Sequence, residues 1–111
     1  MATEQNFSIR KGRTSEIEVY VPDVDDWTGL AAKLYAYSSL EESSIVFAVD
    51  GVIAESSNTI TFEITHDDTK EVEETSLHYE IVVYAIDKSY IKDTNYGLIY
   101  IAPVGMIDPT I

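Results

Sequence analysis

The chain has 111 residues, a length typical of one domain, and 45% of them are hydrophobic, enough to form a buried core. Its 20 acidic and 7 basic residues give a formal net charge of −13, and such a surface repels nucleic acid phosphates and anionic lipid. The sequence contains no cysteine, which excludes disulfides and catalysis by a thiol. It has no apolar run near the roughly 18 residues of a membrane span and no apolar segment at its start, so neither a membrane span nor a signal peptide is predicted.

Short strands separated by turn residues are predicted along the whole chain. The first covers residues 7–10 and is followed by a Lys11-Gly12 turn. Residues 17–21, 32–37 and 59–64 alternate apolar and polar side chains, the pattern of antiparallel strands with one face in solvent.

The second half of the chain supplies further strands. Asp50-Gly51 divides an apolar segment and predicts a type I′ hairpin at that point. Residues 79–86 are apolar on both faces, which favours a position in the middle of a sheet or under a partner, and a closing strand is expected at 97–101. Turns are expected at 56–58 and 94–97. The pattern predicts an all-β protein, an antiparallel β-sandwich of about seven to eight short strands, with a small barrel as the less favoured alternative.

His66-Asp67-Asp68-Thr69 is the densest polar cluster and has the composition of a metal or acid–base site. Zinc sites take three or four ligands, however, and the only other histidine, His78, falls on an expected strand. Thr65 can instead cap a helix, and aspartates in a first turn favour the helix dipole. We therefore expect one short helical turn near residues 66–75.

Asp23, Asp25 and Asp26 share one loop and suggest a calcium site. The EF-hand spacing is not met, because the glycine of this loop comes only at Gly29. Asx turns, with Trp27 folded over the sheet edge, are the favoured interpretation, and calcium binding is the alternative.

The sequence contains eight tyrosines, which are the remaining candidates for a binding surface. Tyr35, Tyr37, Tyr84 and Tyr100 are expected on a sheet face, an arrangement found at protein interfaces, on carbohydrate platforms and as ordinary outward strand residues. No nucleophile–base constellation, phosphate loop or metalloprotease motif is present. The sequence thus predicts no catalytic residue, no metal and no cofactor.

Two segments are candidates for partner binding. Arg10, Lys11 and Arg13 place a basic spot on an acidic protein, which an acidic neighbour would contact, although a solvated turn is the simpler explanation. We divide the chain into a β domain, 1–102, and a C-terminal arm, 103–111. The arm is either a frayed terminus or an anchor on another subunit, and its apolar side chains are Val104, Met106, Ile107 and Ile111.

Four segments, in this order, carry a resemblance: FSIRKGRT, DDWTGLAAKLYAY, ITHDDTKEVEETSLHYEIVVYA and YGLIYIAPV. Their order resembles tailed-bacteriophage structural proteins with small Ig-like β-sandwich domains, such as head accessory proteins and the front domains of baseplate and tail-fibre proteins. The resemblance covers nearly the whole chain and implies a place in the virion, after synthesis and assembly in the bacterial host cytoplasm. It implies no catalytic residues.

The expected function is therefore structural. The chain is expected to be an auxiliary capsid (head decoration) protein that docks on the major capsid protein or on tail or fibre subunits, with a homo-oligomer as an option and no nucleic acid or membrane partner. A tail, baseplate or head-fibre adaptor is one alternative. A carbohydrate- or calcium-dependent ligand-binding β-sandwich is the alternative from another class.

Overall fold

The computed structural model describes residues 3–22, 24–38, 45–70 and 72–102. Within these ranges the chain is mostly β, with eight strands and two short helical segments. The strands are β1 (Thr3–Glu4), β2 (Phe7–Arg10), β3 (Ser15–Tyr20), β4 (Leu30–Tyr37), β5 (Ile45–Ala54), β6 (Thr59–Ile64), β7 (Ser76–Ala85) and β8 (Ile91–Ala102). The helical segments are the 3-10 turn η2 (Glu55–Ser57) and α1 (His66–Thr69). The predicted all-β class is confirmed, and so is one helical turn at the start of the expected region.

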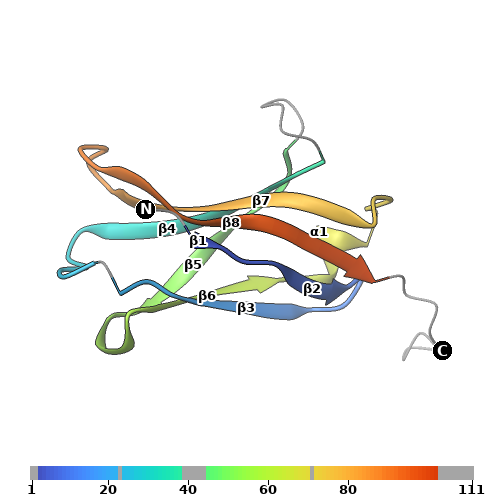
Figure 1. Cartoon of the computed structure of the whole chain (residues 1–111), viewed down its shortest axis with the longest axis horizontal. Helices are drawn as coiled ribbons and strands as arrows, with labels where there is room; N and C mark the ends of the chain where they lie inside the picture. Colours follow the sequence, from blue (N-terminus) through green and yellow to red (C-terminus); the bar gives the residue numbers. More distant parts are fainter. Residues whose placement is uncertain (1–2, 23, 39–44, 71, 103–111) are drawn as a thin grey trace.

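The strands form one curled sheet in the order β1-β8-β7-β4-β5-β6-β3, with β2 also paired to β8 (Figure 1). Most neighbours are antiparallel, whereas β1 and β2 run parallel to β8. β7 lies between β8 and β4, the central position predicted for it. The predicted sandwich of two separate sheets is not confirmed, because β5 pairs with both β4 and β6 and so joins the strands β8, β7 and β4 to β6 and β3.

β5 crosses the domain from β4 to β6 (Figure 1). Its residues up to Asp50 pair with β4, and those from Gly51 onward pair with β6. The hairpin predicted at Asp50-Gly51 is therefore wrong. A Cβ at residue 51 would lie 2.6 Å from Cγ2 of Ile60 and 2.8 Å from Cε1 of Phe62, so the glycine permits close packing on the core and not a chain reversal.

The turn predicted at 94–97 is also wrong, because these residues belong to β8, and the chain reverses earlier, at residues 86–90. Gly97 has a φ of 151°. A Cβ there would collide with the carbonyl oxygen of Gln5. This glycine therefore serves the close approach of the N-terminal segment to β8.

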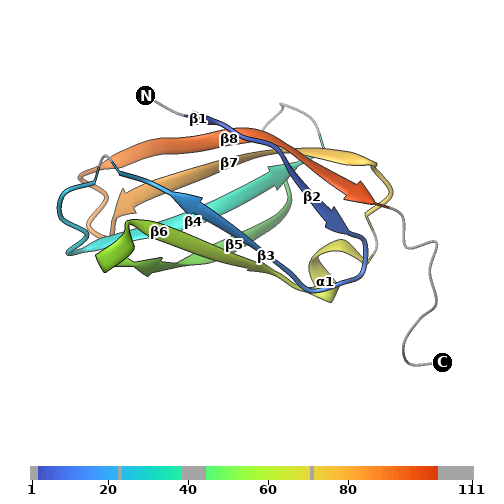
Figure 2. The same ribbon diagram turned by 60° about the horizontal axis from the view of Figure 1, so that its bottom comes forward.

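The core lies between two parts of the curled sheet. In Figure 2 strands β8, β7 and β4 lie on one side of the domain and β6 and β3 on the other. Alternate side chains from both sides point inward and form one hydrophobic cluster. Its members that are fully shielded from solvent include Leu34, Ile60, Phe62, Ile64, Leu77, Ile81, Val83 and Ile99.

Candidate functional site

The basic residues of the predicted partner-binding segment lie at the turn between β2 and β3. Gly12 has a φ of 72°, and the amide of Arg13 donates to the carbonyl of Arg10 at 3.2 Å. Arg10 is exposed, Lys11 and Arg13 are half-buried, and Arg13 is engaged within the protein. Arg10 and Lys11 are therefore the cations of this turn best placed to meet a partner. The other predicted contacts, Val104, Met106, Ile107 and Ile111, lie outside the described residues.

Helix α1 holds this basic turn by both main-chain groups of one glycine. The amide of Gly12 donates to Oγ1 of Thr69 at 2.9 Å, and Nδ1 of His66 donates to the carbonyl of Gly12 at 2.7 Å. Thr69 is completely buried. The sequence offered no signal for this link, because its partners are more than fifty positions apart.

The two carboxylates of α1 bind neighbouring residues of the same helical turn. The amide of Thr65 donates to Oδ2 of Asp68 at 2.8 Å, and the hydroxyl of Thr65 reaches the same oxygen at 3.0 Å. Thr65 is the N-cap, as predicted, although the capping carboxylate belongs to Asp68. Lys70 bonds Asp67 at 3.1 Å and lowers the pKa of that carboxyl. The cluster therefore stabilises local structure.

In the loop with the candidate calcium ligands, the described part forms the predicted Asx turn. Asp23 lies outside the described residues, and Asp25 and Asp26 are exposed. The amide of Thr28 donates to Oδ1 of Asp26 at 2.9 Å and lowers the pKa of Asp26. Trp27 is 5% exposed and donates from Nε1 to Oδ1 of Asn58 at 2.9 Å. Within 3–22, 24–38, 45–70 and 72–102, no three His, Asp or Glu side chains are grouped so as to hold a metal.

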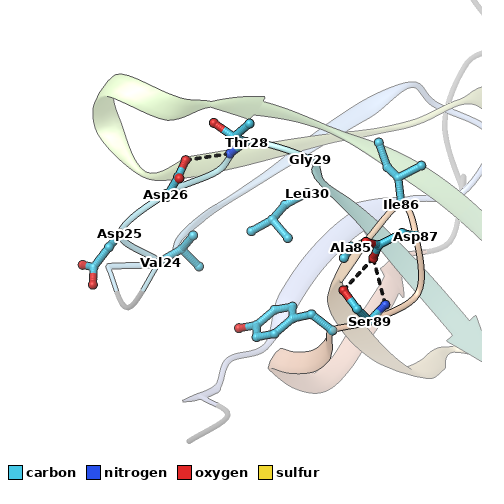
Figure 3. Close-up of a pocket in the computed structure, with 11 residues that line it drawn as sticks. Val24, Asp25, Asp26, Thr28, Gly29, Leu30, Ala85, Ile86, Asp87 and Ser89 are labelled. Atoms are coloured by element: carbon cyan, nitrogen blue, oxygen red, sulfur yellow. Dashed lines mark hydrogen bonds between the residues drawn. The ribbon is translucent and has the colours of Figure 1, made fainter.

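An open cavity of about 690 Å³ lies between this loop and the turn that joins β7 to β8 (Figure 3). The amide of Ile86 donates to the carbonyl of Gly29 at 3.0 Å and ties the two segments together. Asp87 accepts from the amide of Ser89 at 2.9 Å and from its hydroxyl at 2.6 Å, which lowers the pKa of Asp87. Asp26 and Asp87 thus line the cavity with carboxylates that are fixed by hydrogen bonds within their own turns.

The tyrosines expected on a sheet face lie on the outer face of β4, β7 and β8. Buried and half-buried residues alternate along β4 from Ala31 onward, and Tyr35 and Tyr37 belong to the half-buried set. Tyr100 of β8 lies between two buried residues, and Tyr84 of β7 follows a buried residue. Tyr96, which the sequence did not single out, joins them opposite Glu80 and is 46% exposed. The described strands therefore present an aromatic surface to solvent.

Comparison with known proteins adds no relative: no protein-family model matches the chain, and no curated protein matches it. Among the residues that the structure describes, no helix has the length and apolar character needed to cross a membrane.

Proposed function

We propose that the protein is a non-enzymatic structural component of a bacteriophage particle, specifically an auxiliary capsid (head decoration) protein that docks on neighbouring virion subunits. The docking role rests on one observation, a basic turn anchored at the end of a strongly acidic domain. The virion context rests on the resemblance of the four segments to tailed-phage structural proteins. A tail, baseplate or head-fibre adaptor is the alternative within the same class.

The anchoring of the basic turn supports docking physically. Both main-chain groups of Gly12 are bonded to α1, so the turn is ordered before a partner arrives. A preformed contact avoids part of the entropy cost of binding. Arg10 and Lys11 would then steer and orient an acidic neighbour. The apolar arm, residues 103–111, is proposed as the second contact.

Incorporation into particles tests this proposal. A tagged chain produced during phage infection should sediment with particles on a density gradient, and its absence from them would reject the virion assignment. Arg10→Glu with Lys11→Glu should reduce incorporation at low salt, and the reduction should shrink as the salt concentration rises, because salt screens exposed charges. Lys88→Glu with Lys92→Glu makes the same change of net charge in and beside the β7–β8 turn and serves as the matched control. Equal incorporation of both double variants would contradict docking through the basic turn.

The cavity between Asp26 and Asp87 favours a second candidate function, a ligand-binding module. Its carboxylates would accept hydrogen bonds from sugar hydroxyls or bind calcium, and Tyr90 lines the same cavity. A ligand that binds only the native state raises Tm with its concentration. Thermal melts in millimolar calcium and with soluble oligosaccharides therefore test this candidate, and unchanged melts would reject it.

A further inference from the structure

A groove of about 550 Å³ lies on the outer sheet face, on regular strands and away from the loop cavity. Tyr37 comes from β4, Glu80 from β7, and Tyr96 and Leu98 from β8. Glu80 stands directly opposite Tyr96, and His78 stands opposite both Tyr37 and Leu98. Because the strands are paired on both sides, these walls are held in fixed relative positions.

The charges that line the groove are one-sided. Glu4, Glu80 and Asp93 contribute three carboxylates, and the lining includes neither lysine nor arginine. Tyr37 is half-buried, and its burial and its hydrogen bond to Glu80 raise the pKa of its hydroxyl. Tyr37 therefore stays neutral and leaves the negative charge on the carboxylates.

Aromatic and acidic groups together select a cation. Ring faces attract ammonium and guanidinium groups, and carboxylates neutralise and hydrogen-bond them. Leu98 offers an apolar surface for the methylene stem of a long basic side chain. A phosphate, a nucleic acid or an acidic peptide would instead be repelled by the three carboxylates.

We propose that this groove binds a lysine or arginine side chain from a basic segment of a different protein. A second copy of the chain is a poor occupant, because it brings the same net charge of −13 and long-range repulsion opposes its approach. The site is separate from the basic turn at residues 10–13. It therefore stands even if docking through that turn fails.

Calorimetric titration with a pentalysine peptide tests the charge requirement. Glu80→Gln with Asp93→Asn should weaken pentalysine binding about tenfold, because the double variant removes two partly exposed charge contacts. Glu16→Gln with Glu18→Gln removes the same charge from the exposed face of β3 and should change Kd by less than about twofold. Equal weakening by the two double variants would overturn the proposal in favour of diffuse attraction, and so would absence of pentalysine binding.

A second measurement tests how much the aromatic side chains of the groove contribute to pentalysine binding. Tyr96→Leu keeps the charge and should weaken pentalysine binding about threefold through loss of the cation–aromatic contact. Lysine-acetylated pentalysine, which lacks the side-chain cations, should not bind. Amide shifts in the complex should concentrate at 78–80 and 96–98, and shifts centred on β3 would place the peptide elsewhere. If a neutral oligosaccharide, and not pentalysine, moved these amides, the assigned occupant would be wrong.

Discussion

His66 donates from Nδ1 to the carbonyl oxygen of Gly12 at 2.7 Å, across 54 positions of sequence. The residue that most suggested chemistry therefore holds the main chain of the basic turn. Its neighbour Thr69 completes the attachment from the buried side of the helical turn. The stability of α1 and the conformation of residues 10–13 are consequently coupled.

Thr69→Val tests this coupling. The valine keeps the volume but leaves the amide of Gly12 without its acceptor, which should cost about 1–3 kcal/mol of unfolding free energy. Urea denaturation measures the loss. Thr61→Val, on the outer face of β6, is the matched control and should change stability by less than about 0.5 kcal/mol. A Thr69→Val variant as stable as the control would show that the bond contributes nothing.

Gly51→Ala tests the crossing of β5 between the two parts of the sheet. The added methyl would collide with Ile60 and Phe62 and should lower stability by about 1–3 kcal/mol. Phe62→Leu removes two of the contacting ring atoms, so the double variant should be less destabilised than the sum of the single variants. Strictly additive losses in urea melts would mean that the ring does not cause the clash.

Asn58 combines two roles that substitutions separate. It adopts a left-handed conformation, with φ of 53°, and accepts the indole proton of buried Trp27. Asn58→Gly keeps the backbone and loses the acceptor, at a cost of about 1–3 kcal/mol. Asn58→Ala should cost about 1–2 kcal/mol more, because alanine disfavours this conformation. Trp27 fluorescence during urea unfolding measures the stability of both variants. Equal stability of Asn58→Gly and Asn58→Ala would contradict the predicted backbone strain at residue 58.

Alkaline stability should depend on Tyr79. Burial raises the pKa of Tyr79 above its ordinary value of about 10, so the neutral phenol is favoured in the folded state. Its contribution to stability is complete below about pH 10 and is lost as pH rises through the folded-state pKa. Tyr79→Phe should therefore show a shallower loss of stability above pH 10.

The neutral-pH effect of the same variant is separate. The Tyr79 hydroxyl donates to the carbonyl of Gln5 at 2.5 Å, and its removal should cost about 1 kcal/mol. Tyr20→Phe, at a position 63% exposed, is the control and should leave the alkaline profile unchanged. Identical pH profiles for Tyr79→Phe and the natural protein would refute the assignment. Urea melts at a series of pH values supply all of these comparisons.

Local pattern predicted the β class and most strand positions because burial alternates along these strands. The segment 59–64 matches β6 residue for residue, and the expected helical turn starts at His66. The hairpin at Asp50-Gly51 failed for a tertiary reason. A glycine that makes room for Phe62 has the same local signature as a glycine that turns the chain.

The candidate surfaces were predictable only in part. Tyr35, Tyr37, Tyr84 and Tyr100 were found because side-chain alternation assigns residues to one face of a strand. The groove was not found, since it needs the register that places Glu80 beside Tyr96. No local pattern in the sequence specifies which strands become neighbours.

The pairing of the first strands with the last one affects how the protein is made. β2 aligns with residues 99–102, so its ladder on β8 cannot form until nearly all of the described chain has been synthesised. At about 5 to 20 residues per second, the first strands wait on the order of ten seconds on the ribosome. Throughout that interval the nascent chain carries an unpaired strand with Ile9 uncovered. Chaperone binding or mispairing with another chain would compete with folding at this stage.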